Sequence, residues 1–128
     1  MQTLGKIALV VADYDEALDY FVGTLGFDQL EDTDMGGGKR WVVVAPSGGG
    51  CALLLAKAKN DEQRAAIGKQ TGGRVFLFLE TQDFDHDYER YDELGVDFIE
   101  EPRRESYGKV VVFRDLYGNL WDLVGRNQ

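Results

Sequence analysis

Short apolar segments separated by polar turns make up the first half of the chain. Residues 6–12, 40–45 and 51–56 are dominated by valine, leucine, isoleucine and alanine, and this composition over so short a length predicts strands. Residues 27–33 are a weaker strand candidate. The glycine-rich stretch 36–39 lies between two of these segments and predicts a tight turn. The pattern therefore predicts four strands before residue 57.

A helix is predicted between the first two strands, over residues 15–25. Its apolar residues recur at helical spacing and would form one stripe along the helix. They are Ala17, Leu18, Phe21, Val22 and Leu25. Asp13 is positioned to cap the start of this helix, and Gly26 to end it.

The second half of the chain repeats this order of elements. A strand is predicted at 74–80 and a helix at 84–94, and three further strands follow. These strands are 96–101, 109–114 and 120–125. A polar stretch at 58–73 separates the two halves, and a short helix is expected within it, over 60–70.

An internal repeat explains this recurrence. Asp13 and Asp83 are 70 positions apart, and so are the turn residues Gly48 and Gly118. A constant offset indicates two copies of one unit, each with the order strand, helix and three strands. We expect residues 1–128 to form a single α+β domain. It would contain module one (4–57), the linker (58–73) and module two (74–126).

Composition and charge narrow the classes of partner. The chain is 44% hydrophobic and has 14 basic against 23 acidic residues, a net charge of −9. Such acidity disfavours nucleic acids and anionic membrane surfaces as partners, although it also serves ordinary solubility. A single cysteine, Cys51, excludes an intrachain disulfide. No apolar run is long enough to span a membrane, so we expect a cytoplasmic protein.

The closing segment FRDLYGNLWDLV (113–124) fits an F-x-D-x-x-G-N-x-x-[ED]-L pattern, and the first predicted helix ends in LGF (25–27). Together with the repeat, these features resemble the vicinal oxygen chelate superfamily, in particular its bacterial glyoxalase-like branch. This superfamily includes glyoxalase I, bleomycin-resistance proteins and extradiol dioxygenases. The resemblance covers essentially the whole chain. It implies a curled, cup-shaped mixed sheet made of two βαβββ modules, a small-molecule ligand and a homodimer.

Enzymes of this superfamily hold a divalent metal with four side chains, one from the first and one from the last strand of each module. Carried over by position, these sites are Lys6, Ala52, Phe76 and Asp122. Only Asp122 is an acceptable metal ligand, and one carboxylate does not hold a divalent ion against water. The interpretation is that the chain binds no metal and needs no cofactor.

Strand alternation places residues two apart on the same face, which defines an expected pocket lining. The lining residues are Lys6, Ala8, Ala52, Leu54, Phe76, Phe78, Glu80 and Asp122. In one register, Trp41 and Trp121 lie beside these positions and not on them, with Trp121 packed toward the helix. Such a pocket is mostly apolar, with two aromatic rings and a few charges. The alternative is that Phe76 and Phe78 fill it as core.

Two functions of different classes stay open. The first is metal-free binding of a small, partly apolar or cationic molecule, as in sequestration by resistance proteins. The second is a glyoxalase-like lyase or isomerase with an altered or metal-dependent site, whose catalytic residues the sequence does not identify. Lys6 and Asp122 are expected to pair across the module boundary, either as a structural ion pair or as a group that binds or polarises a substrate.

Overall fold

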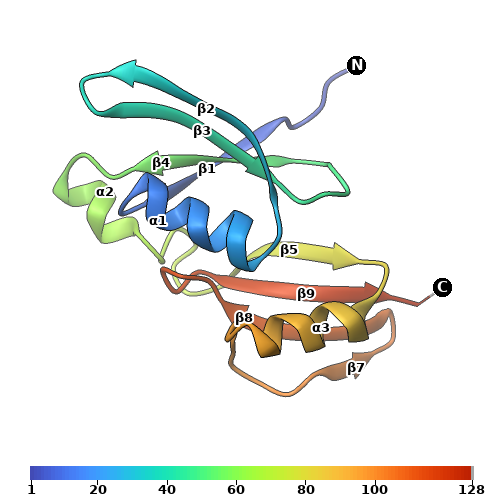
Figure 1. Ribbon diagram of the computed structural model, residues 1–128. Coiled ribbons are helices and arrows are strands. Elements are labelled where there is room, and N and C mark those ends of the chain that lie inside the picture. Colours follow the sequence, from blue (N-terminus) through green and yellow to red (C-terminus); the bar gives the residue numbers. More distant parts are fainter. Residues whose placement is uncertain (128) are drawn as a thin grey trace. The chain divides into compact units, whose positions relative to one another are not determined.

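The computed structural model describes residues 1–127, which divide into two compact units, one up to Ile67 and the other from Gly68 onward (Figure 1). The division falls inside the stretch 58–73 that was predicted to be a linker. Its short helix, α2 (Asp61–Ala66), belongs to unit 1 and is capped by Asn60, whose side chain accepts a hydrogen bond from the Gln63 N–H.

Unit 1 contains a four-stranded sheet with the spatial order β1-β4-β3-β2 (Figure 1). β1 and β4 are parallel, and the other neighbours are antiparallel. The strands are β1 (Lys6–Val11), β2 (Asp28–Gly36), β3 (Lys39–Ala45) and β4 (Ala52–Lys57). All four predicted strands are present, and β2 extends three residues further than expected, as far as the turn at Gly37 and Gly38.

The helix of unit 1 begins as predicted and ends differently. The Asp13 carboxylate accepts a hydrogen bond from the Glu16 N–H, which caps α1 (Tyr14–Leu18). The chain then continues as a π-helical segment, η1 (Asp19–Thr24), with the Leu25 N–H bonded to the carbonyl of Tyr20 five residues back. Gly26 follows with φ +79°, the left-handed conformation that ends helices.

The core of unit 1 lies between α1 and one face of the sheet. Tyr14 joins the two, because its hydroxyl accepts a hydrogen bond from the Arg40 N–H at the start of β3. Strand alternation then places the helix-facing residues, all at most 4% exposed, at every second position. These residues are Leu9, Val11, Val42, Val44, Leu53 and Leu55, opposed by Ala17, Phe21 and Leu25 of the helical segment and its end.

Unit 2 repeats this arrangement, with strand order β5-β9-β8-β6, where β6 is Asp97–Phe98, and an additional strand, β7 (Arg103–Glu105), paired with β8. β5 (Val75–Thr81) and β9 (Leu120–Arg126) are parallel, as are β1 and β4 in unit 1. The third strand is β8 (Gly108–Arg114), and the helix is α3 (Phe84–Glu93). Asp83 caps α3 through the His86 N–H, so the capping aspartate is repeated at the predicted offset of 70.

The predicted strand 96–101 is wrong in its extent. Only β6 (Asp97–Phe98) forms there, and β7 (Arg103–Glu105) follows it. Two observations explain the break. Pro102 has no N–H to donate to the ladder, and the Glu100 side chain takes the place of a backbone acceptor by binding the Val112 N–H. The second strand of the module is thus split into two short pieces against β8.

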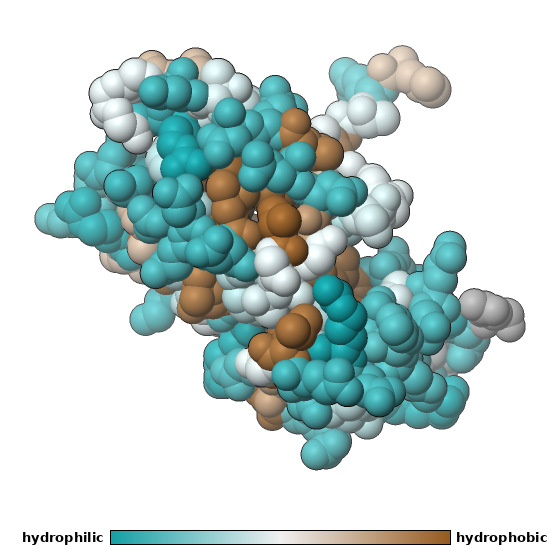
Figure 2. All heavy atoms as spheres, in the orientation of Figure 1, coloured by the Kyte–Doolittle hydropathy of each residue, from teal (hydrophilic) through white to brown (hydrophobic). Residues whose placement is uncertain are grey.

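The predicted α+β fold class with two βαβββ modules is confirmed. Within residues 1–127, no helix is long and apolar enough to cross a membrane. Figure 2 shows one side of the molecule, where hydrophilic side chains predominate and hydrophobic ones gather in small groups.

Candidate functional site

The face of each sheet that points away from its helix carries most of the predicted lining residues. We call it the helix-distal face. In unit 1, β1 and β4 pair in the register Lys6–Ala52 and Ala8–Leu54, so these four residues share that face. Lys6 and Ala52, two of the positions carried over from the superfamily's metal sites, are thus opposite each other in the strand register.

Trp41 also lies on the helix-distal face of unit 1, contrary to the expectation that it lies beside the lining. The register explains the correction: Val43 is opposite Leu54, and alternation brings Trp41 to the same side. Val43, Ala45 and Ala52 are buried in a small cluster, and Trp41 and Leu54 pack against it. The Trp41 indole N–H donates to Glu31 at 3.1 Å. The sequence left Trp41 off the lining because the strand that contains it was not among those used to define the lining.

The helix-distal face of unit 2 is built around Phe78 and Asp122, which are directly opposite each other in the β5–β9 pairing. The Phe78 side chain is 64% exposed, a large apolar surface left open to solvent. Trp121, by contrast, lies on the helix face as predicted. It is 3% exposed and stacks on Phe113 with the ring centroids 5.8 Å apart.

Phe76 does not occupy the position that the repeat implies. Val75 pairs with Leu120 and Leu77 with Trp121, so Phe76 is the additional residue of a β-bulge. The bulge shifts the register by one residue, and the β5–β9 pairing as a whole is shifted by two residues from the β1–β4 pairing, so Phe78 and not Phe76 faces Asp122. A constant offset of 70 cannot reveal such a local insertion.

Asp122 is the most unusual carboxylate on this face. One of its oxygens, Oδ1, is buried and accepts no hydrogen bond from any residue in 1–127. Burial raises the pKa of Asp122 above its usual value, Glu100 raises it further, and Arg103 opposes them. A half-buried carboxylate with a free oxygen has an unmet capacity to accept a hydrogen bond.

Charged side chains surround Phe78 and Asp122. Glu80, also on β5, forms an ion pair with Arg126 of β9. Arg103 is held by Glu100 at 2.9 Å and by Glu105 at 2.6 Å. The carboxylates and cations of this face are thus matched to one another, except at Asp122.

The four positions at which the superfamily's enzymes bind metal do not fit a divalent ion in this chain. Lys6 carries a positive charge, Ala52 and Phe76 have no donor atom, and one carboxylate remains. Among residues 1–127, no group of three or more His, Cys, Asp or Glu side chains could hold a metal. The sole histidine, His86, is exposed on α3.

The structure therefore brings the predicted lining residues together in two sets. Lys6, Ala8, Ala52 and Leu54 share one face of unit 1, and Phe78, Glu80 and Asp122 share one face of unit 2. The expected pair between Lys6 and Asp122 joins residues of different units and stays a prediction.

Comparison with known proteins gives consistent matches over the whole chain. A family model described as "Glyoxalase/Bleomycin resistance protein/Dioxygenase superfamily" matches residues 3–123. An uncharacterized protein of Shewanella frigidimarina (strain NCIMB 400) is 55% identical over 128 residues, which cover 98% of this chain and 95% of that protein.

Solved structures match equally completely. The crystal structure of UcmS2 is similar with a TM-score of 0.83 and 28% identity, over 97% of this chain and 98% of that one. TnmS3 of Streptomyces sp. CB03234, described as an antibiotic binding protein, has a TM-score of 0.78 and 29% identity. That match covers 99% of this chain and 98% of TnmS3.

Proposed function

Because this chain belongs to the glyoxalase/bleomycin resistance protein/dioxygenase superfamily, we propose that it binds a small, partly apolar molecule without a metal ion. The ligand carries a cation or another hydrogen-bond donor. Binding removes the molecule from solution without altering it, as in sequestration.

One observation supports this proposal most strongly: an exposed phenyl ring lies directly opposite a carboxylate that has a free oxygen. Phe78 offers apolar surface, and burying it would contribute at about 25 cal/mol per Å². Asp122 Oδ1 would accept a hydrogen bond from the ligand, and its negative charge favours a cation. The apolar face of unit 1, with Ala8, Leu54 and Trp41, suits the hydrophobic remainder of such a molecule.

The absence of a suitable donor set at the metal positions supports a function that needs no Lewis acid. Lys6, Ala52 and Phe76 cannot replace the nitrogen and oxygen ligands of the enzymes. The likeness to the antibiotic binding protein TnmS3 over nearly the full length of both chains favours ligand binding further. That both units contribute to one binding site is part of the proposal.

A lyase or isomerase reaction is the second candidate, and Asp122 is the residue that favours it. A carboxyl group with a raised pKa and a free oxygen is suited to remove a proton from a bound substrate. In this alternative, Asp122 is the general base and the protein turns the ligand over.

The test uses the full-length protein purified without chelator, in which zinc, nickel, manganese and iron are measured by elemental analysis. The protein is then treated with EDTA and titrated with rhodamine 6G, a fluorescent aromatic cation. We expect no stoichiometric metal and saturable binding that EDTA does not change. Replacing Asp122 by Asn or Phe78 by Ala would weaken binding by about tenfold each, the effect of losing about 1.4 kcal/mol.

Leu30→Ala is the matched control, since Leu30 is an exposed apolar residue in unit 1. This variant should bind the dye as the wild type does. A stoichiometric metal whose removal abolishes binding would overturn the proposal, and so would equal affinities of wild type, Phe78→Ala and Asp122→Asn. Chemical change of the dye or of an offered α-keto hemithioacetal, lost in Asp122→Asn, would favour the second candidate.

Two further parts of the proposal concern assembly and location. A homodimer and a cytoplasmic site of action are inferred from the resemblance and from the sequence alone. Light scattering coupled to size-exclusion chromatography measures the first directly, with a mass of twice 14.3 kDa expected for the dimer.

A further inference from the structure

A small cluster of a cation, an aromatic ring and an acid occurs in both units on the helix side of the sheet. In unit 1, the Arg40 guanidinium lies 5.2 Å from the centre of the Tyr14 ring and pairs with Asp15 at 2.9 Å. In unit 2, the Lys109 ammonium lies 6.0 Å from the centre of the Phe84 ring and pairs with Asp85 at 2.7 Å. Tyr14–Asp15 and Phe84–Asp85 are 70 positions apart, and the cations Arg40 and Lys109 are 69 positions apart, so the two clusters occupy corresponding places in the two units.

The strand opposite the cation differs between the units in the sign of its charge. Arg40 faces Asp34 across β2 and β3, whereas Lys109 faces Arg104 across β7 and β8. Opposite charges at facing positions stabilise a pair of strands, and like charges destabilise it. Unit 2 therefore places two cations where unit 1 has a cation and an acid.

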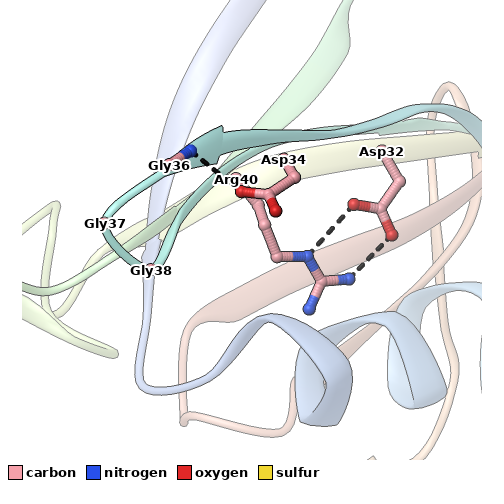
Figure 3. A pocket seen from close by; sticks show the side chains of 6 residues that line it. All are labelled: Asp32, Asp34, Gly36, Gly37, Gly38 and Arg40. Atoms are coloured by element: carbon pink, nitrogen blue, oxygen red, sulfur yellow. Dashed lines mark hydrogen bonds and ion pairs between the residues drawn. The ribbon is translucent and has the colours of Figure 1, made fainter.

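In unit 1 the cation is fully engaged. Figure 3 shows Arg40 directed at Asp32, to which it donates two hydrogen bonds of 3.1 and 2.7 Å. A third hydrogen bond of 2.9 Å goes to Asp15. The cavity at this hairpin is lined by Asp32, Asp34, Gly36, Gly37, Gly38 and Arg40. Because the positive charge of Arg40 is already neutralised by these carboxylates, this cavity is not suited to bind an anion.

In unit 2 the charges are not neutralised in this way. The side chain of Arg104 is exposed and makes no hydrogen bond or ion pair with any residue in 1–127, although its backbone pairs with β8. Lys109 has one acidic partner, Asp85, whose side chain is 76% exposed and screened by water. Arg103, the third cation of this region, is bound to Glu100 and Glu105. Two positive charges are thus left with one weak partner.

A cavity of about 330 Å³ lies beside these cations. Its apolar wall is made of Phe84, Tyr88 and Pro102. The Phe84 and Tyr88 rings are nearly parallel, with an angle of 8° between their planes and centroids 6.0 Å apart. Flat apolar walls with a few charged groups at one side are typical of sites for small aromatic ligands.

We propose that this cavity of unit 2 is a second ligand site, which binds a small, flat aromatic anion such as an aryl carboxylate. The ring would lie against Phe84, Tyr88 and Pro102. The anionic group would bind Arg104 and Lys109 and remove the repulsion between these two facing cations. This site is separate from the helix-distal face, because Lys109 and Phe84 are on the helix side of the sheet.

The test is a titration of the full-length, ¹⁵N-labelled protein with 2-naphthoate, followed by NMR and by isothermal calorimetry. We expect saturable binding with amide shifts concentrated at Tyr88, Arg104 and Lys109. Arg104→Glu restores the charge arrangement of unit 1 and should weaken binding by at least about tenfold. The neutral analogue 2-naphthalenemethanol should bind at least about tenfold more weakly than the anion to the wild type.

Lys39→Glu is the matched control, because it makes the same change in net charge at an exposed position in the hairpin of unit 1. It should leave the affinity for 2-naphthoate unchanged. Equal weakening by Lys39→Glu and Arg104→Glu would show a general charge effect and overturn the proposal. Absence of saturation at millimolar 2-naphthoate, or shifts confined to β1–β4, would overturn it as well. Asp122→Asn separates the two proposals, since it should affect rhodamine 6G and not 2-naphthoate.

Discussion

The two units share a topology and a pattern of buried residues, yet they differ in the side chains on their helix-distal faces. In unit 1 the helix-distal face has mainly alanine, leucine and valine around Trp41. In unit 2 the same face has Phe78 exposed and Asp122 with an unpaired oxygen. Duplication has preserved the positions that packing dictates and has changed the positions that a ligand would contact. If the proposed ligand binds, the two units would therefore contact it with different chemistry.

The turns that precede the last strand of each unit differ in the same way. In unit 1 this turn contains three consecutive glycines, residues 48–50. In unit 2 it is organised by Asp115, which is 5% exposed. One oxygen of Asp115 accepts hydrogen bonds from the N–H groups of Tyr117 and Asn119, and the other accepts from the side chains of Asn119 and Trp121. The turn of unit 2 is therefore held by hydrogen bonds to a buried carboxylate, whereas the corresponding turn of unit 1 is formed by glycines.

The largest effect is expected from replacing the glycine at the start of β8. Gly108 has φ +146°, and a Cβ there would lie 2.0 Å from the carbonyl oxygen of Gly125. Because backbone must move to relieve this contact, Gly108→Ala should lower the free energy of unfolding by more than about 4 kcal/mol. The change in the free energy of unfolding is measured by urea denaturation monitored by circular dichroism.

Gly38→Ala provides the comparison in unit 1, at the glycine 70 positions before Gly108. Gly38 also has a positive φ, +83°, but a Cβ there has no atom within 4 Å. Gly38→Ala should lower the free energy of unfolding by about 1 kcal/mol, because only the unfavourable backbone conformation contributes. If Gly108→Ala and Gly38→Ala lower the free energy of unfolding equally, the close approach of β8 and β9 in unit 2 is not the reason for the loss in Gly108→Ala.

The second effect concerns the buried carboxylate of unit 2. Asp115→Ala leaves the Trp121 indole N–H and the Asn119 amide without their acceptor, and both residues are 3% exposed. The free energy of unfolding should fall by about 3 kcal/mol. Ser47→Ala, in the exposed turn of unit 1, should change it by less than about 0.5 kcal/mol. A loss below about 1 kcal/mol for Asp115→Ala would mean that water replaces the carboxylate.

A smaller effect of opposite sign is expected from Arg104→Glu. The substitution replaces a repulsive facing pair with an attractive one between positions 104 and 109. The free energy of unfolding should rise by about 0.5 kcal/mol at low salt, and the gain should fall as salt is added. A loss of stability would contradict the inferred repulsion between Arg104 and Lys109.

The smallest effect follows from the raised pKa of Asp122. A carboxyl whose pKa is higher in the folded than in the unfolded state contributes stability below the unfolded pKa. This contribution is lost as the pH rises through the folded pKa. Asp122→Asn should therefore be slightly more stable than the wild type at pH 7, and the difference should vanish below about pH 4. Thermal unfolding of both proteins across this range checks the sign.

The sequence predicted the elements with regular periodicity and missed those decided by pairing between strands. The caps at Asp13 and Asp83 and the glycine at 26 depend on local chemistry, and the structure confirms them. The bulge at Phe76 and the bond from the Val112 N–H to Glu100 depend on partners across the sheet, which a pattern within one strand does not encode; Pro102 was the one local signal of the break.

The candidate site shows the same limit. Alternation along each strand correctly grouped Ala8 with Lys6, and Leu54 with Ala52. It placed Trp41 on the wrong face because the register between β3 and β4 was unknown. Whether Lys6 pairs with Asp122 depends on how two units meet, which lies beyond any pattern within one strand.

The most direct test of metal-free ligand binding is the affinity of EDTA-treated protein for rhodamine 6G, compared between the wild type and Asp122→Asn. We expect the treated wild type to bind as tightly as untreated protein and Asp122→Asn to bind about tenfold more weakly. Binding that disappears with EDTA and returns with a divalent metal would contradict the account.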